Sequence, residues 1–200
     1  QPGIQDPVTG AWRLEPLPYP PGMTPLPVTV AVLAGGASRR MGVDKVLLEI
    51  NGVALLDHVL AAAAGLPTIV VGRHHPGVWS IADPSPERRG PLAGLVAALE
   101  VCDGPVLLVA ADQPWLRSAT LLALAAAADD ASPVAPTDGG VRQALCAVYP
   151  ASVLIEARRL LDAGRGPQAV LDLGCRDILP EVWKGWGEDG QSWFSVDTPE

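Results

Sequence analysis

A short segment after the first apolar run of the chain combines the residue types that bind phosphate. Gly35 and Gly36 have no Cβ atoms, so backbone N–H groups can approach phosphate oxygens closely there. Arg39, Arg40 and Lys45 follow, and they place three of the chain's 14 Lys and Arg residues within seven positions. We expect this Gly-rich segment to bind a polyphosphate through backbone amides and through charge.

The Gly-rich segment differs from the two most common phosphate-binding motifs. A P-loop requires GxxxxGK followed by Ser or Thr, and a GxGxxG motif is excluded because Ala37 stands where its second glycine would be. The plainer interpretation is a Gly-rich turn after a strand, followed by two solvated arginines. The added spacing of Lys45 favours phosphate binding over that interpretation.

Aspartates follow three of the predicted strands. Asp112 comes directly after the apolar run 105–111, so its carboxylate is the first charged group at that end of the strand. Because Mg²⁺ binds carboxylate and phosphate oxygens and keeps several waters, one or two aspartates are enough for a site. Asp83 follows the run 79–82, and Asp197 follows the run 192–196. A helix N-cap is the alternative for Asp112, and ordinary turn chemistry is the alternative for Asp83.

Composition argues against several classes of protein. The net charge of −8 and the isoelectric point near 4.8 disfavour duplex nucleic acid or an anionic membrane as the main partner. The hydrophobic fraction of 48% is too high for a disordered chain, and we expect no membrane span because no apolar run is long enough. The three cysteines are widely spaced and indicate neither a disulfide framework nor a zinc site, so the expected location is a reducing cytoplasm.

The apolar pattern from Val28 onward predicts an α/β domain with a largely parallel sheet, because β-branched runs alternate with Ala- and Leu-rich stretches. Two connections, 35–46 and 112–118, directly follow predicted strands. Ligands of open α/β sheets bind at the carboxyl ends of strands, so both connections should face one site. The predicted strands are 28–34, 68–71, 79–82, 105–111, 133–136, 143–149 and 192–196. The predicted helices are 54–64, 91–101, 118–128, 151–163 and 167–173.

Residues 1–27 differ from the rest of the chain, since they contain eight of its 21 prolines. Proline fixes φ and lacks a backbone N–H, so we expect neither a helix nor a sheet ladder in this segment. The segment also lacks the basic and apolar regions of a secretory signal. We therefore expect a flexible, Pro-rich appendage over 1–27 and a single domain over 28–200.

Residues 33–48 match the pattern LAGGxSxRMGxDKxLL almost throughout, and through this segment the chain resembles the molybdenum cofactor guanylyltransferases of the nucleotidyltransferase superfamily. The resemblance continues to the last residue of the sequence. Its further motifs are PLAG at 91–94, ADQP at 111–114, RQAL at 142–145 and VDTPE at 196–200.

The resemblance implies a Rossmann-like, three-layer nucleotidyltransferase fold of the α/β class with a mostly parallel central sheet. It implies a cytoplasmic enzyme that joins GMP from GTP to molybdopterin with the help of Mg²⁺. Further partners would be other cofactor-biosynthesis proteins or apo-molybdoenzymes. By position, Lys45, Arg39 and Asp112 match catalytic residues, and Asp112 also matches the metal ligand. The nucleotide-binding residues that the resemblance implies are Leu33, Ala34, Gly35, Gly36, Arg39, Arg40, Lys45, Asp83 and Asp112.

Two features near the end of the chain leave alternatives open. Relatives carry Asn within an NxNTPED pattern where this chain has Asp197. The carboxylate of Asp197 can be a second metal ligand, or it can change the contact with the pterin. Similarly, Trp183, Trp186 and Trp193 can cap the core or stack on a flat pterin, and core capping is the more common role.

Other functions fit parts of the sequence. A molybdopterin cytidylyltransferase or a sugar-phosphate nucleotidyltransferase would use the same fold. The Ala34-Gly35 pair favours guanylyl transfer by resemblance, because cytidylyl relatives usually carry Ala-Ala-Gly there. Gly72, in contrast, stands where some guanylyl relatives carry Asn. A non-catalytic carrier of nucleotide or cofactor is a further alternative, and the presence of both Asp112 and Lys45 argues against it.

Overall fold

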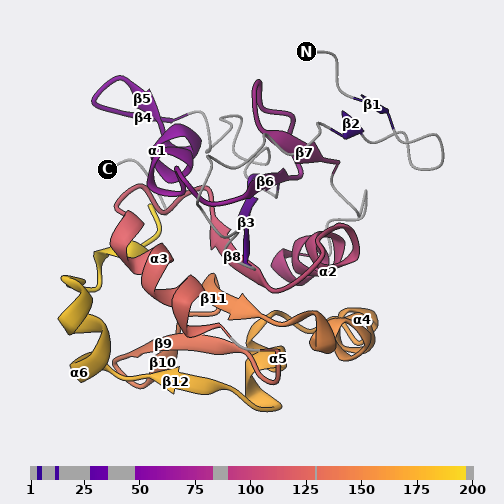
Figure 1. Ribbon diagram of the computed structural model, residues 1–200, viewed down its shortest axis with the longest axis vertical. Helices are drawn as coiled ribbons and strands as arrows, with labels where there is room; N and C mark the ends of the chain where they lie inside the picture. Colours follow the sequence, from indigo (N-terminus) through magenta and orange to yellow (C-terminus); the bar gives the residue numbers. More distant parts are fainter. Residues whose placement is uncertain are drawn as a thin grey trace, which may run out of the picture.

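The centre of the protein is an eight-stranded sheet (Figure 1). The computed structural model describes residues 28–35, 48–82, 90–128 and 130–196, together with the backbone of 4–5 and 12–13. From one edge to the other, the strands of the sheet are β10 (Val141–Arg142), β9 (Val134–Asp138), β11 (Cys146–Tyr149), β8 (Val106–Ala110), β3 (Thr29–Leu33), β6 (Thr68–Val71) and β7 (Trp79–Ile81), with β12 (Arg176–Ile178) paired to β9.

Most pairings in this sheet are parallel. β3 is parallel to both of its neighbours, β8 and β6, and β6 is parallel to β7. β12 is also parallel to β9. The exceptions are β11, which is antiparallel to β8 and β9, and β10, which is antiparallel to β9. The predicted α/β class with a mostly parallel central sheet is therefore confirmed.

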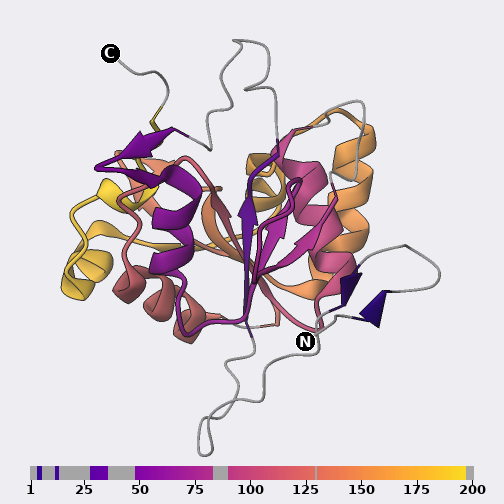
Figure 2. The ribbon, with the colours of Figure 1, turned by 90° about the horizontal axis from the view of Figure 1, so that it is seen from above.

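Helices cover both faces of the sheet and give the protein three layers (Figure 2). The first face is covered by α1 (Leu55–Ala62) and α3 (Ser118–Ala127), and the second by α2 (Pro91–Val101), α4 (Leu154–Asp162) and α5 (Gln168–Asp172). A strand covered on both faces has to be apolar throughout rather than alternating. This explains why the continuous apolar runs of the sequence predict the central strands well.

Successive side chains of a central strand contribute to opposite layers. In β3, Val30 and Val32 pack with the helices of the first face, whereas Ala31 packs with those of the second. All five residues of β8 are buried. Burial of each valine or leucine side chain among these stabilises the fold by about 1.5–3 kcal/mol. The strands β3 and β8, whose central residues are buried, thus lead directly into the two connections that carry predicted site residues.

Short elements complete the described chain. β4 (Glu49–Ile50) and β5 (Val53–Ala54) form a hairpin around Asn51 and Gly52, whose φ values of 54° and 77° suit a tight hairpin turn. The others are β1 (Ile4–Gln5), β2 (Trp12–Arg13), α6 (Pro180–Trp183) and the 3₁₀ turns η3 (Ala151–Val153), η4 (Lys184–Trp186) and η5 (Gln191–Trp193). No helix in the described ranges is long and apolar enough to cross a membrane.

Two expectations from the sequence are wrong. The predicted strand 192–196 is instead the turn η5 followed by residues outside any strand. The N–H and hydroxyl of Ser192 both donate to the Glu188 carboxylate, so a local contact replaces strand pairing. The segment 1–27 does contain a short ladder, because β1 and β2 form an antiparallel pair. Neither strand includes a proline, so their backbone N–H groups remain available.

The sequence pattern also misses β12 and misplaces the start of β11. Arg176 and Asp177 of β12 are exposed and only Ile178 is buried, so the strand has no apolar run. The predicted strand 143–149 begins only at Cys146, because the preceding residues form a turn. Edge strands and strand ends form mainly through backbone hydrogen bonds. The pattern of apolar side chains therefore predicts their positions poorly.

Candidate active site

Three parallel strands end side by side at one edge of the sheet (Figure 1). The N–H of Ala34 donates to the carbonyl oxygen of Val71 at 2.9 Å, and the N–H of Ala111 donates to the carbonyl oxygen of Leu33 at 3.0 Å. These bonds join the ends of β6, β3 and β8. The first residues of the Gly-rich segment therefore lie next to the first residues of the connection that contains Asp112.

Of the Gly-rich segment (33–45), the structure describes Leu33, Ala34 and Gly35. Helix α2 packs closely against the start of this segment. A Cβ atom built on Gly94 of α2 would lie 2.5 Å from the Cδ2 atom of Leu33. Glycine at this position therefore lets the first turns of the helix approach the end of β3. This contact gives a physical role to the PLAG motif at 91–94, to which the sequence alone assigned none.

Asp112 lies at the end of β8 and is partly exposed. The next residue, Gln113, is only 2% exposed, and its side-chain Oε1 accepts a hydrogen bond from the N–H of Ala110 at 2.9 Å. The backbone of Gln113 also donates to the carbonyl oxygen of Ala110 and accepts from the N–H of Leu116. Gln113 thus fixes the turn that holds Asp112 at the sheet edge, a positioning role that sequence reasoning missed.

The C-terminal segment returns to the same edge of the sheet. The N–H of Val196 donates to the carbonyl oxygen of Asp112 at 3.0 Å. Val196 is the last described residue, and Asp197 follows it directly in the sequence. The chain therefore reaches Asp197 from a point that is hydrogen-bonded to Asp112.

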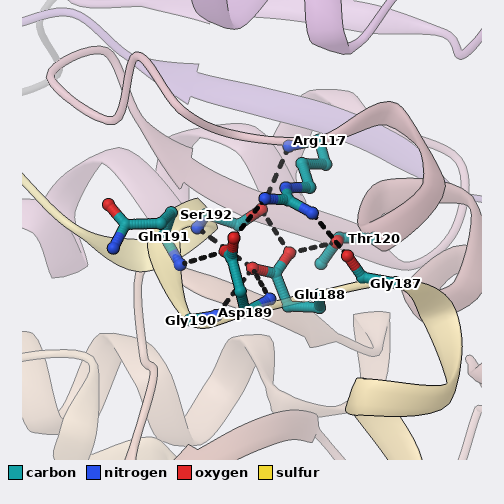
Figure 3. Close-up of polar contacts among 8 residues, drawn as sticks. All are labelled: Arg117, Thr120, Gly187, Glu188, Asp189, Gly190, Gln191 and Ser192. Carbon is teal, nitrogen blue, oxygen red and sulfur yellow. Dashed lines mark hydrogen bonds and ion pairs between the residues drawn. The ribbon is translucent and has the colours of Figure 1, made fainter.

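A buried carboxylate holds this C-terminal segment against α3 (Figure 3). Glu188 is 4% exposed and accepts hydrogen bonds from the hydroxyl groups of Thr120 and Ser192. It also accepts from the backbone N–H groups of Asp189, Gly190 and Ser192, at 3.0, 2.9 and 3.3 Å. One side chain thus satisfies donors on both partners of the contact.

The pKa of Glu188 shows which influence on the carboxylate dominates. Burial by itself would raise this pKa, but the hydrogen bonds from Ser192, Thr120 and the backbone outweigh burial and lower it below the usual value.

Arg117 adds a second contact between the same segments, since its guanidinium donates to the Gly187 carbonyl oxygen and the Asp189 carboxylate (Figure 3). The N–H of Gln191 and the charge of Arg117 lower the pKa of Asp189. The sequence carries no motif that indicates this contact.

The late tryptophans cap the core rather than line the candidate site. Trp183 is 3% exposed, and its Nε1 donates to the carbonyl oxygen of Thr137 at 3.1 Å. Trp193 packs edge-on against it, with ring centroids 5.1 Å apart, and donates to the Asp138 carboxylate at 3.1 Å. Trp186 packs against the same cluster. Of the two roles left open by the sequence, the structure supports core capping.

Arg142, the first residue of the RQAL motif at 142–145, has a structural role. The Nε and NH2 atoms of Arg142 donate to the two carboxylate oxygens of Asp177, at 2.7 and 3.1 Å. This bidentate pair lowers the pKa of Asp177 and connects β10 with β12 across β9, to which both strands are paired.

The structure brings four of the predicted site residues together, namely Leu33, Ala34, Gly35 and Asp112. The remaining predicted site residues lie outside the described residues: Gly36, Arg39, Arg40, Lys45, Asp83 and Asp197. Within the described ranges there is no group of three or more His, Cys, Asp or Glu side chains that could hold a metal ion. A single aspartate beside bound phosphate still fits Mg²⁺, which needs few protein ligands.

Comparison with known proteins agrees with this geometry. The sequence profile described as the MobA-like NTP transferase domain matches residues 30–178, which include all but the first residue of β3, the Gly-rich segment and Asp112. The chain belongs to this family. As a member of this family, it is a nucleotidyltransferase. The RQAL and PLAG motifs both lie within the matched range.

Individual relatives of this NTP transferase carry a more specific name. The chain is 32% identical over 185 residues to "Probable molybdenum cofactor guanylyltransferase" of Chloroflexus aggregans, covering 84% of this chain and 88% of the relative. It is also 32% identical over 164 residues to "Molybdenum cofactor guanylyltransferase" of Acidiphilium cryptum, covering 74% and 81%.

A solved structure has the same fold. The NTP transferase superposes on molybdopterin-guanine dinucleotide biosynthesis protein A from Archaeoglobus fulgidus with a TM-score of 0.73 and 26% sequence identity. The alignment covers 86% of this chain and 93% of that protein. The three-layer nucleotidyltransferase fold implied by the sequence is thus confirmed.

Proposed function

We propose that this NTP transferase transfers GMP from GTP to the phosphate of molybdopterin and releases pyrophosphate, which yields the guanine dinucleotide form of the molybdenum cofactor. Two relatives that align over most of their length carry the name of this activity. The observation that carries the proposal is the junction at Leu33 and Ala111, where the Gly-rich segment and the Asp112 connection begin side by side.

The reaction is a direct displacement at the α-phosphorus of GTP. An oxygen of the acceptor phosphate forms the new P–O bond, the bond to the bridging oxygen breaks, and pyrophosphate leaves with the negative charge. A phosphate monoester is largely ionised near neutral pH, so no general base is required. The protein has to position two mutually repelling anions and neutralise charge on the leaving group.

Residues of the Gly-rich segment suit the triphosphate. Gly35 and Gly36 offer backbone N–H groups, and Arg39, Arg40 and Lys45 offer positive charge. Gly35 lies two residues after the end of β3 and is exposed. The charge of these cations matters all the more because the whole chain carries a net charge of −8.

Asp112 is the residue that would hold Mg²⁺, with Asp197 as the candidate for a second ligand. When bound, Mg²⁺ neutralises charge on the phosphate oxygens of the nucleotide. The hydrogen bond from the Val196 N–H to the carbonyl oxygen of Asp112 supports this pair, because it brings the chain to Asp112 immediately before Asp197. The alternative role of Asp197, a contact with the pterin, is compatible with the same placement.

We assign recognition of the nucleotide base to Ala34, Gly35 and Asp83. A carboxylate can accept two hydrogen bonds from guanine, one from N1–H and one from the exocyclic amine, whereas cytosine offers only its exocyclic amine. Asp83 is the second residue after β7 in the sequence, and β7 is parallel to β6 on the side of the sheet away from β8. GTP should therefore be preferred over CTP.

The proposed function is tested by kcat/KM for GTP and CTP with purified molybdopterin as the acceptor. A clear preference for GTP supports guanylyl transfer. A preference for CTP, or equal values, would leave the nucleotidyltransferase fold intact but assign the chain to cytidylyl or less selective transfer. Nucleotide binding without turnover on any nucleoside triphosphate would favour the carrier function instead. The cytoplasmic location and the further protein partners stay predictions.

A further inference from the structure

Two aromatic side chains are exposed beside Asp112. Trp115 is 42% exposed and Phe194 is 55% exposed, and their rings contact each other edge-to-face with centroids 5.6 Å apart and an interplanar angle of 63°. We call them the aromatic pair. Among the large apolar side chains that the structure describes as exposed, these are the aromatic ones. Leaving two contacting rings in water forgoes the free energy of burial, which is typical of a binding surface.

Hydrogen bonds fix the aromatic pair on both sides. The N–H of Val196 donates to the carbonyl oxygen of Asp112, and the N–H of Arg117 donates to the Ser192 hydroxyl, both at 3.0 Å. One ring lies between Asp112 and Arg117 in the sequence, and the other lies between Ser192 and Val196. The two segments are thus connected before and after the pair, and the rings are presented from a rigid support.

The buried carboxylate of Glu188 strengthens this support. It accepts hydrogen bonds from the hydroxyl group of Ser192 and from that of Thr120 on α3 (Figure 3). Arg117 adds its contact with Asp189. A preorganised surface loses little conformational entropy when a ligand binds, so this arrangement suits recognition better than two free side chains would.

The position of the aromatic pair separates it from the expected base site. Trp115 follows β8 within the Asp112 connection, whereas Asp83 follows β7. In the sheet, β7 is separated from β8 by β3 and β6, which corresponds to about 14 Å at the usual strand spacing. The pair therefore lies on the Asp112 side of the sheet and away from the strand that precedes the residue assigned to the guanine base.

We infer that Trp115 and Phe194 form the stacking surface for the flat, conjugated ring system of the acceptor. The inference rests on the proposed function for the identity of that acceptor. Aromatic side chains bind flat heterocycles through their faces, and the interaction tolerates varied substituents. The aromatic pair gives the acceptor an anchor beside Asp112, while its phosphate reaches the nucleotide.

Steady-state kinetics of three Trp115 variants test the stacking role. Trp115→Ala and Trp115→Leu should raise KM for molybdopterin by about ten-fold, whereas Trp115→Phe should stay within about three-fold because it keeps a ring face. The KM for GTP should stay within about two-fold in all three variants, since the nucleotide binds elsewhere. Phe194→Ala should behave like Trp115→Ala. Ile155→Ala is the control, because Ile155 is an apolar side chain on α4 that is 81% exposed and belongs to the second face of the sheet.

A binding measurement separates this inference from the proposed function. The probe is 6-hydroxymethylpterin, whose fluorescence anisotropy should rise on addition of the wild-type protein or Trp115→Phe but not of Trp115→Ala or Trp115→Leu. If every variant has the wild-type KM for molybdopterin and binds the probe equally, the inference is wrong while GMP transfer stands. If the wild type transfers no GMP but the probe binds in a Trp115-dependent way, the proposed function fails and the stacking surface remains.

Discussion

Gly72 lies directly against the backbone of Gly35, although the two residues are far apart in the sequence. A Cβ atom built on Gly72 would lie 2.6 Å from the Cα atom of Gly35 and 2.7 Å from its N atom. The N–H of Gly72 donates to the carbonyl oxygen of Ile81 at 2.9 Å, and its φ is 90°, in the region that favours glycine. The end of β6 therefore supports the start of the Gly-rich segment without room for a side chain.

This contact predicts a specific effect of Gly72→Ala. The new Cβ atom has to displace the backbone of Gly35, so the free energy of unfolding should fall by about 2–4 kcal/mol and the affinity for GTP should fall with it. Gly65→Ala is the matched control, because Gly65 has the same φ of 90° but has nothing within 4 Å of its Cβ position. It should lose about 1 kcal/mol and bind GTP normally. Equal losses in both variants would show that backbone conformation alone, and not the Gly35 contact, matters.

Removal of the Lys45 ammonium group should slow the reaction. Lys45 supplies a compact positive charge to the triphosphate in the proposed mechanism, so Lys45→Ala should lower turnover at least about ten-fold at saturating GTP. The melting temperature should change little. Lys184→Ala is a suitable control, because Lys184 lies on η4 over the ring of Trp183 and not at the candidate site. A wild-type rate in Lys45→Ala at saturating GTP would remove Lys45 from the mechanism.

Asp112 should determine how much Mg²⁺ the transferase activity requires. Asp112→Asn keeps the volume of the side chain but removes its charge, so the Mg²⁺ concentration needed for half-maximal activity should rise about ten-fold or more. Asp103→Asn is the matched control, since Asp103 precedes β8 and is exposed at the opposite end of the strand. If Mg²⁺ titrations with GTP give the same midpoint for wild type and Asp112→Asn, the ligand assignment is wrong.

Glu188 should make stability depend on pH in the acidic range. Its folded-state pKa is lowered, so its stabilising contribution is present above the unfolded-state value of about 4.3 and is lost as pH falls through the folded-state pKa. Glu188→Gln should therefore lower the free energy of unfolding by roughly 2 kcal/mol at pH 7. The difference from wild type should shrink as the pH falls below about 4.

The measurement for Glu188 is thermal or urea unfolding of wild type and variant at pH 7, 5, 4 and 3. Comparison with the wild type at each pH removes the effect of other carboxylates that titrate in the same range. Glu181→Gln, an exposed residue of α6, should be close to neutral throughout. A destabilisation by Glu188→Gln that is constant from pH 7 to pH 3 would mean that shape, and not charge, determines the contact.

Deletion of residues 1–27 should leave the chemistry intact. The segment is rich in proline, and the matched family domain begins at residue 30. The transferase rate of the shortened chain should stay within about two-fold of the full chain, as for other changes outside a site. Circular dichroism of both chains provides the check on folding. A large loss of rate in a folded, shortened chain would show that the segment contributes to the site.

The sequence by itself determined the central parallel strands, the phosphate-binding residue types and the family. Strands buried on both faces are continuous apolar runs, so β3, β6 and β8 are recognisable from local pattern alone. The Gly-rich segment and Asp112 stand out for a similar reason, because each follows such a run directly. These signals are local in the chain, which is why no tertiary information was needed to find them.

Only the tertiary structure decided which distant residues support the site. The contact of Gly72 with Gly35, the hydrogen bond from Thr120 to Glu188 and the ring contact of Trp115 with Phe194 each join separate parts of the fold. Glu188 shows the limit most clearly, since an acidic residue among glycines suggests a solvated loop but here lies buried against α3. Such contacts depend on how strands and helices pack together, and no periodicity within one segment encodes that packing.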